Sequence, residues 1–358
     1  MHFSGTYSQQ DVHILLKPAL IPTVDVDAKE AMIQSGDKHY SEMISPETVP
    51  DERYMQLYSE ALERNAGRLS RDVAKLAEIL THRPQTKETC VIISLARAGT
   101  PIGVLLKRQL ERLGISVFHY SVSIIRGRGI DANALRYISE RHDPKNCIFL
   151  DGWTGKGAIK GELERSLEGN KWGFDPFLAV IADPAGRADI AATDEDYVIP
   201  SGLLNGIVSG LISRSVLNDE LVGKGDFHAC LFQEEHAGHD VSNDFIEAVE
   251  KACWPSDPFK GWTPEAAKLA HSKCEALIQH IVAQYGIDDI NRIKPGIAES
   301  TRAILRRVPE MVLLKDPEDP EVQHIIHLAN ATGVPIQTAD LGNYRSVTII
   351  KKLGREQE

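Results

Sequence analysis

Short apolar runs alternate with helix-forming segments through much of this 358-residue chain. The runs have the character of buried strands, because they consist mainly of apolar and β-branched residues and are followed by glycines or polar residues. The predicted strands are Cys90–Leu95, Ile115–Ile125, Cys147–Leu150, Phe177–Ile181 and, as a possible fifth, Tyr197–Ile199. The predicted helices between them are Ile102–Leu113, Ala132–Glu140 and Ala158–Leu167. This alternation predicts an α/β fold in which helices cover both faces of a parallel sheet.

The bulk composition is that of an ordinary globular protein, with 42% hydrophobic and 25% charged residues. Its apolar runs are too short to span a membrane, and Met1–Gly5 does not resemble a signal peptide. The five cysteines form no C-x-x-C pair, so neither a disulfide framework nor a cysteine zinc site is indicated. We expect a cytoplasmic protein with no membrane partner, and homo-oligomer formation stays open.

Charge divides the chain unevenly. Residues 291–358 hold ten basic and nine acidic side chains, a net charge of +1, whereas the whole chain carries −11 and the remainder therefore −12. The acidic remainder argues against a general nucleic-acid binder there, because such binding depends on neutralising phosphates. We predict an irregular segment over 1–45, a large α/β domain over 46–260, a helical connector over 261–290 and a second domain over 291–358.

The last segment has its own alternation of strands and helices. A small, separable α/β unit is predicted, because the sheet and core of the large domain lie before residue 260. Its predicted elements are a helix over Glu299–Arg307, a strand over Met311–Leu314, a helix over Pro320–Ala331, and strands over Pro335–Thr338 and Ser346–Ile350.

A glycine-rich loop follows the predicted strand that ends at Leu150. It runs Asp151-Gly152-Trp153-Thr154-Gly155-Lys156-Gly157 and leads directly into a helix. Glycines allow backbone N–H groups to converge, and a helix N-terminus attracts a phosphate. Asp151 lies at the carboxyl end of its strand, where it would face a sugar or a metal. The spacing does not fit a nucleotide-triphosphate P-loop, and an ordinary surface turn is the alternative.

Two further segments carry anion-binding chemistry. One is the loop after the first predicted strand, which offers small residues, an arginine and a helix start at Pro101. Its candidate residues are Ser94, Ala96, Arg97, Ala98, Gly99 and Thr100. The other is Arg126-Gly127-Arg128, a cationic segment able to close over an anion, although such a segment is more often a solvated turn. Together they predict two phosphate-binding regions flanking a sugar-sized gap.

These loops resemble those of the type I phosphoribosyltransferases, which have a Rossmann-like parallel sheet. More narrowly, the chain resembles the phosphoribosyltransferase family of bacterial tellurite-resistance and stress-response operons, also labelled StiP, over about residues 3–260. The matching segments are Phe3–Tyr7 with Asp11-Val12, Tyr40–Met43, Ser209–Arg214 and Gly225–His228. In one departure, the general transferase loop has two adjacent acids and a longer run before Thr-Gly, whereas this loop has Asp151 alone.

The resemblance implies attack of an acceptor on C1 of phosphoribosyl pyrophosphate, with pyrophosphate leaving. In that reaction Asp151 would position the ribose hydroxyls, while Thr154 and the N–H groups of Gly155–Gly157 would bind the 5′-phosphate. Arg97 and Gly99 would bind pyrophosphate, and Arg126 and Arg128 would close over it. Mg²⁺ would be held by the substrate without direct protein ligands. No residue identifies the acceptor, which the family resemblance implies to be base-like; a non-catalytic sensor of a phosphoribosyl ligand is the main alternative.

The segment Lys294–Arg302 is similar to the start of the RNA-binding helix in the Pelota and kink-turn-binding ribosomal protein superfamily. Gly296, Glu299, Arg302 and Arg306 are the residues that this resemblance places near structured RNA. Ala298 stands where that superfamily has asparagine, so we expect contacts with phosphates rather than bases. A docking domain with a solvated basic helix face is the alternative.

Two rival sites involve histidine and cysteine. Zinc binding by Asp226, His228, His236, His239 and Asp240 is disfavoured, because their spacing matches no helix-based motif. A cysteine hydrolase would use Cys230, two residues after His228, but the local sequence offers neither a base nor an oxyanion site.

Overall fold

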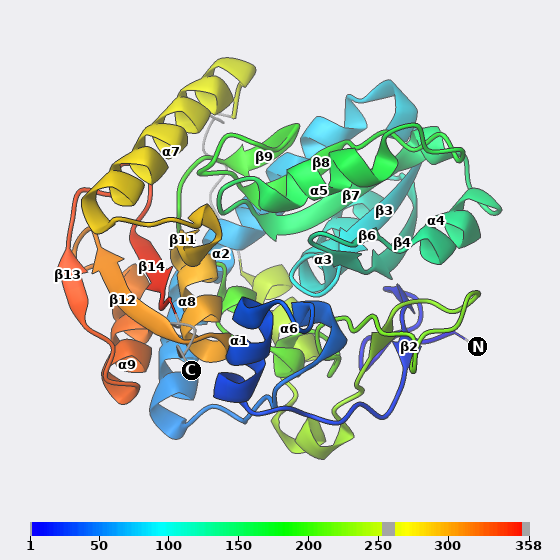
Figure 1. The fold of residues 1–358 in the computed structure, drawn as a ribbon. Coiled ribbons are helices and arrows are strands. Elements are labelled where there is room, and N and C mark those ends of the chain that lie inside the picture. The colour runs from blue at the N-terminus through cyan, green and yellow to red at the C-terminus, as the bar shows by residue number, and fades with distance from the viewer. Residues whose placement is uncertain (1, 253–261, 353–358) are drawn as a thin grey trace.

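The large domain of the computed structural model, which describes residues 2–252 and 262–352, is built on a six-stranded parallel sheet, seen at the upper right of Figure 1. Its strands, in spatial order, are β1 (His13–Leu15), β4 (Ser116–Val122), β3 (Thr89–Leu95), β7 (Cys147–Trp153), β8 (Leu178–Ala182) and β9 (Ile190–Thr193). Each strand pairs in parallel with its neighbours. The predicted parallel α/β fold is confirmed.

Helices cover both faces of this sheet. One hydrophobic cluster joins one face to α2 (Glu52–Thr81), α3 (Gly99–Arg112) and α6 (Ser242–Lys251). Another joins the opposite face to α4 (Ala132–Ser139) and α5 (Ala158–Leu167). Alternate residues of a strand point to opposite faces, and both faces are apolar, which explains why the strands are nearly continuous hydrophobic runs.

The order of the strands creates a crevice at one edge of the sheet. Leaving aside β1, the strands in chain order are β3, β4, β7, β8 and β9, and the chain moves from β3 to β4 on one side and then to β7 on the other. Connections that leave adjacent strands in opposite directions separate the loops at their carboxyl ends, and ligands bind between them. The two predicted phosphate loops follow β3 and β7, the strands that flank this switch point.

Some local predictions differ from the structure. The segment 1–45 is not irregular throughout, because it contains β1, β2 (Lys17–Pro18) and α1 (Val26–Ser35). The sheet's fifth predicted strand is β9, not Tyr197–Ile199, where the backbone N–H of Val198 donates to the Glu321 carboxylate instead of a strand. The long predicted strand Ile115–Ile125 divides into β4 and a hairpin of β5 (Ile124–Ile125) and β6 (Gly129–Ile130). The short strand β10 (Ala229–Cys230) pairs with β2.

The C-terminal part is a small α/β unit preceded by the long helix α7 (Pro264–Tyr285), as predicted (Figure 1). Its sheet has the order β11-β14-β12-β13, in which β14 is antiparallel to β11 and β12. The elements are β11 (Ile293–Pro295), α8 (Ile297–Arg306), β12 (Pro309–Leu314), α9 (Gln323–Ala331), β13 (Ile336–Thr338) and β14 (Ser346–Ile350).

The two domains share one core, contrary to the expectation of a separable unit. Tyr54 and Leu203 of the large domain belong to the same buried cluster as Ile304, Val322 and Ile325 of the C-terminal domain. Helix α2 packs against α9 as well as against elements of the large domain. Within the described residues, no helix is both long and apolar enough to cross a membrane.

Candidate functional site

The two predicted phosphate loops border a single cavity of about 300 Å³ at the switch point. Ten of the predicted transferase residues line it, namely Ala96, Arg97, Ala98, Arg126, Asp151, Trp153, Thr154, Gly155, Lys156 and Gly157. Five others do not appear in its lining, namely Ser94, Gly99, Thr100, Arg128 and Gly152. Both loops therefore border the same cavity, although part of each loop lies outside its lining.

Three residues of the first loop do not line the cavity and pack into the core, namely Ser94, Gly99 and Thr100. The Ser94 hydroxyl lies 2.8 Å from Nε2 of His119, and the Thr100 hydroxyl lies 2.7 Å from that of Ser121. A Cβ at Gly99 would lie 2.4 Å from the carbonyl oxygen of Leu150. Gly99 therefore allows α3 to begin directly against the end of β7, which brings the two loops together.

Arg97 is anchored by protein groups, an arrangement that the sequence did not reveal. The Ala96–Arg97 peptide is cis, and the guanidinium bonds to both carboxylate oxygens of Glu47 at 2.7 and 2.5 Å. It also donates to the carbonyl oxygen of Ile212 at 2.8 Å. Burial alone would raise the pKa of Glu47, but the Arg97 guanidinium outweighs it and holds that pKa at about 2. Arg97 and Glu47 thus form an ion pair.

Asp151 ends β7 inside the cavity. Its carboxylate accepts from the N–H of Gly152 at 2.8 Å. Burial raises the pKa of Asp151 to about 7, against the lowering influence of Arg302, while Glu299 adds to the rise. This carboxyl group therefore changes charge near neutral pH, as a group that handles a substrate hydroxyl can do.

The loop after Asp151 presents free backbone donors. The N–H groups of Gly155, Lys156 and Gly157 have no protein acceptor in the described part of the chain. Gly157 has a φ of +84° and immediately precedes α5, so these donors lie at a helix N-terminus. The Thr154 hydroxyl donates to Asp183 and is therefore already engaged. The backbone of this loop is the stronger candidate for binding an anion.

A first group of cations surrounds this second loop and consists of Arg126, Lys156 and Lys294. Burial, followed by repulsion from Arg126, lowers the pKa of Lys156 to about 8 and that of Lys294 to about 7. Lys156 donates to the carbonyl oxygen of Ile293 at 3.0 Å. None of the three forms an ion pair with a carboxylate within the described residues. We call them the loop-155 cations.

A second group consists of Arg97 of the first loop together with Arg214, Arg302 and Arg306, and Arg302 also lies against Trp153 of the second loop. Burial lowers the pKa of Arg306 most strongly, and Arg97 and Arg302 add repulsion. Burial likewise lowers the pKa of Arg214 to about 10, with Arg97 contributing. Glu47 supplies one negative charge beside these four guanidinium groups. The remaining excess of like charge favours binding of a further anion. We call these four residues the loop-97 cations.

Helix α8 brings the predicted RNA-binding residues to the same cavity. Glu299, Arg302 and Arg306 line it, and Glu299 lies 3.8 Å from Arg302. The Arg302 guanidinium lies 4.5 Å from the centroid of the Trp153 ring. Their side chains keep 34% (Glu299) and 27% (Arg302) of their surface exposed because they border the cavity. Gly296, with a φ of +91°, forms the turn before α8.

Arg126 and Arg128 separate in the structure, although they are only two residues apart. Arg126 lines the cavity, whereas Arg128 forms a 2.6 Å ion pair with Glu42. The intervening backbone is held by Glu162, which accepts from the N–H groups of Gly127 and Gly129 at 2.8 and 2.9 Å. Only Arg126 is placed to contact a ligand in this cavity.

A second cavity of about 620 Å³ adjoins the first and shares Lys29, Arg214 and Arg306 with it. Sequence reasoning assigned no role to Lys29, Glu47, Arg214 or Lys294. Arg214 and Lys294 lie in segments that carry the family resemblances, so the sequence marked these positions but did not indicate what they do. Lys29 and Glu47 carried no local signal.

The rival sites have little geometric support. Cys230 is fully buried, which raises the pKa of its thiol to about 12, and Nδ1 of His228 lies 2.8 Å from the Ser123 hydroxyl. The other described cysteines, Cys90, Cys147 and Cys274, are also buried, and no cysteine lines either cavity; Cys253 lies outside the described residues. No group of three metal-ligating side chains occurs in residues 2–252 or 262–352.

Fold and site define a doubly wound α/β protein whose cationic cavity lies between two domains. Residues 5–250 match the family described as "Tellurite-like stress resistance cysteine protease StiP", and residues 272–352 match the PELOTA RNA-binding domain. The curated protein "Cysteine protease StiP" of Acinetobacter baylyi is 40% identical over 368 residues, covering 99% of this chain and 95% of that protein. The chain belongs to the StiP family.

Solved phosphoribosyltransferases are also similar. A hypoxanthine-guanine phosphoribosyltransferase of Bacillus anthracis is 15% identical, with a TM-score of 0.27, and covers 43% of this chain and 84% of its own. A hypoxanthine phosphoribosyl transferase of Trypanosoma cruzi is 12% identical, with a TM-score of 0.29, and covers 49% of this chain and 93% of its own.

Proposed function

We propose that the protein is a phosphoribosyltransferase that transfers ribose 5-phosphate from phosphoribosyl pyrophosphate to a base-like acceptor. One observation carries the proposal: the switch-point cavity has a separate cationic group at each of its two loops. Phosphoribosyl pyrophosphate has a phosphate at one end of a sugar and a pyrophosphate at the other, which fits two cationic groups. The Asp151 carboxyl belongs to the same cavity and suits the ribose hydroxyls.

The chemistry requires stabilisation of separating charges. The bond from C1 to the pyrophosphate oxygen breaks, that oxygen keeps the electron pair, and C1 bonds to the acceptor, which releases its proton to solvent. Positive charge then develops at C1 and negative charge on pyrophosphate, so preorganised cations lower the barrier. The loop-97 cations would receive the leaving group, and the free N–H groups of Gly155–Gly157 with the loop-155 cations would hold the 5′-phosphate.

Magnesium fits this site as a companion of the substrate. Asp151 and Glu299 are the carboxylates of the described cavity lining, fewer than a protein-built cage would need. Mg²⁺ commonly keeps waters and binds through one or two carboxylates plus substrate phosphates. Asp151 and Glu299 are the residues that would help to hold such an ion, which would supply neutralisation of charge on the leaving pyrophosphate.

Pyrophosphate release tests the proposal. The full chain is incubated with phosphoribosyl pyrophosphate, Mg²⁺ and a panel of nucleobases and related acceptors, and released pyrophosphate is measured. Acceptor-dependent release is expected, and Asp151→Asn should lose most of it because the neutral amide no longer positions the ribose hydroxyls. Asp219→Asn, at an exposed position outside both cavities, is the matched control. Undiminished release by Asp151→Asn contradicts the assignment.

A non-catalytic sensor is the closest alternative, and the single acid of the Asp151 loop favours it. A sensor would bind phosphoribosyl pyrophosphate and release it unchanged with every acceptor. If phosphoribosyl pyrophosphate binds and is then recovered intact with every acceptor, the protein is a sensor; if it is consumed, the protein is an enzyme.

Cysteine hydrolysis is supported by the name of the Acinetobacter baylyi relative. The four described cysteines are buried, and burial raises their thiol pKa values, which opposes formation of the thiolate that attacks a carbonyl. Cys253 requires its own test. Peptide hydrolysis that is lost in Cys253→Ser or Cys230→Ser, but kept in Asp151→Asn, would establish this alternative.

RNA binding is favoured by the match of residues 272–352 to the PELOTA domain. Arg302 and Arg306 face the cavity, so an RNA that uses them must enter where phosphoribosyl pyrophosphate is proposed to bind. We expect the full chain to bind a kink-turn RNA through phosphates, with affinity falling steeply as salt rises. Fluorescence anisotropy of the RNA measures how affinity depends on salt. Addition of phosphoribosyl pyrophosphate as a competitor measures whether the two ligands use the same cavity.

A further inference from the structure

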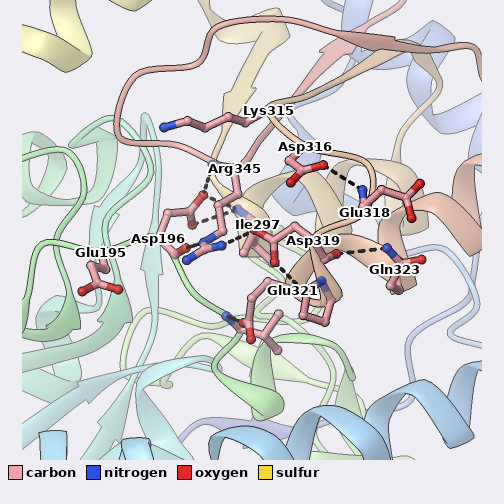
Figure 2. Close-up of polar contacts among 12 residues, drawn as sticks. Glu195, Asp196, Ile297, Lys315, Asp316, Glu318, Asp319, Glu321, Gln323 and Arg345 are labelled. Atoms are coloured by element: carbon pink, nitrogen blue, oxygen red, sulfur yellow. Dashed lines mark hydrogen bonds and ion pairs between the residues drawn. The ribbon is translucent and has the colours of Figure 1, made fainter.

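The C-terminal domain is fastened to the large domain at the start of α8. Asp196, which follows β9 of the large domain, accepts from the N–H of Ile297 at 3.0 Å and from the N–H of Arg345 at 2.8 Å (Figure 2). The Arg345 side chain also donates to the carbonyl oxygen of Asp196 at 2.6 Å. A carboxylate of one domain therefore caps a helix of the other and sets its direction.

Further contacts join the two domains. The buried Glu321 of the C-terminal domain accepts from the N–H of Val198 at 2.6 Å and from Arg64 at 2.9 Å. The Tyr344 hydroxyl donates to the carbonyl oxygen of Gly155 at 2.7 Å. A Cβ at Gly155 would lie 2.7 Å from the Glu299 side chain. The second phosphate loop is thus in direct contact with the C-terminal domain.

This fixed position directs cations of the C-terminal domain into the cavity. Arg302 and Arg306 are four residues apart on α8 and so share one face of the helix. Arg306 bonds to Asn205, but its buried Nε has no partner among the described residues. Lys294, just before α8, lies among the loop-155 cations. Each cationic group therefore contains residues of both domains.

We propose that the C-terminal domain supplies part of the substrate site, so that phosphoribosyl pyrophosphate is bound between the two domains. Lys294 contacts the 5′-phosphate together with Arg126 and Lys156. Arg302 and Arg306 contact the pyrophosphate together with the other loop-97 cations. This inference rests on the proposed function and deepens it, because it gives a domain of an RNA-binding family a role in binding a small phosphorylated substrate.

Calorimetric titration of the full chain with three probes tests the proposal. The probes are phosphoribosyl pyrophosphate, inorganic pyrophosphate and ribose 5-phosphate, each with Mg²⁺. Arg302→Ala and Arg306→Ala should each lower the affinity for inorganic pyrophosphate about tenfold to a hundredfold, the usual loss for one charged hydrogen bond. The same two substitutions should change the affinity for ribose 5-phosphate by less than about threefold. Lys294→Ala should show the reverse preference.

Matched variants separate binding from folding. Lys315→Ala removes an exposed cation of the same domain outside both cavities, and it should bind all probes as the unchanged chain does. Arg302→Lys should recover part of the pyrophosphate affinity, because it restores the charge without the fork of donors. A general loss of structure would weaken all probes equally, so opposite probe preferences identify direct contacts.

Failures of the two proposals have different signatures. If the unchanged chain binds none of the probes, the proposed function is wrong and this inference falls with it. If it binds them, and Arg302→Ala, Arg306→Ala and Lys294→Ala bind them equally well, only the inference is overturned. Should a variant not fold, hydrogen exchange of the unchanged chain decides: phosphoribosyl pyrophosphate must slow exchange in α8, and unchanged exchange there overturns the inference.

Discussion

The charge of Asp151 depends on two residues that come from the other domain. Burial raises its pKa to about 7, Arg302 opposes that rise and Glu299 adds to it. Asp151 is therefore about half ionised near neutral pH in the free protein. Burial is the largest influence on the pKa of this residue of the large-domain sheet, and two side chains of α8, more than a hundred positions later in the chain, adjust it in opposite directions.

Substitutions on α8 should move the pH dependence of turnover in opposite directions. If ionised Asp151 positions the ribose, activity rises with pH through about 7. Arg302→Ala removes the group that lowers this pKa, so the rise should shift to higher pH. Glu299→Gln removes a group that raises it, so the rise should shift to lower pH. Profiles of kcat/KM, which report the pKa values of the free enzyme, measure both shifts, and shifts of the same sign would show that another group titrates.

Ligand binding should draw protons from solution at pH 8. The pKa of Lys294 is about 7 and that of Lys156 about 8, so both are partly neutral there. A bound phosphate stabilises their charged forms and raises both pKa values, while the phosphates of the free ligand are already ionised above a pKa near 6. Calorimetry in two buffers of different ionisation enthalpy gives the number of protons taken up. Lys294→Met should reduce it, and net release would contradict this account.

At the scale of elements, the strands that carry the site were predictable and the edge strands were not. The runs at Cys90–Leu95 and Cys147–Leu150 are almost continuously apolar because both sheet faces are buried; they lie in the seven-residue strands β3 and β7, and their glycine-bearing loops follow directly. The edge strands β1 and β9 have only three and four residues, too short for a distinct period. The loops could be located from sequence, but the anchoring of Arg97 by Glu47 could not, because it joins distant segments.

Gly99 is the element-level test of how the two loops are brought together. In Gly99→Ala the new Cβ would lie 2.4 Å from the Leu150 carbonyl oxygen, and backbone on both sides must shift. We expect a loss of about 1–3 kcal/mol in the free energy of unfolding, as for overpacked cores. Phosphoribosyl pyrophosphate binding should weaken too, because α3 moves from β7. Denaturant unfolding measures the first effect and calorimetry the second.

Gly225→Ala is the control for that substitution, since no heavy atom lies within 4 Å of a Cβ built there. Its stability and ligand affinity should equal those of the unchanged chain. Equal behaviour of the two variants would show that α3 does not need the close approach to β7.

At the scale of the whole molecule, the two domains act as one structural unit. The sequence indicated both domains and the basic face of α8, yet it could not show that this face turns inward. That orientation depends on Asp196 and Glu321, whose partners lie more than a hundred residues away. A local motif identifies which side chains are available, whereas tertiary contacts decide what they face.

Removing residues 291–358 should therefore unfold or aggregate the remaining chain. The truncation takes away Ile304, Val322 and Ile325, which are at most 5% exposed and belong to the same cluster as Tyr54 and Leu203. Each such side chain contributes about 1.5–3 kcal/mol when buried, so losing their contacts removes much of a typical stability of about 5–15 kcal/mol. Size-exclusion chromatography and thermal unfolding of fragment 1–290 measure the outcome. A monomeric fragment that unfolds cooperatively and still binds phosphoribosyl pyrophosphate would show that the large domain and its site are complete without the C-terminal domain.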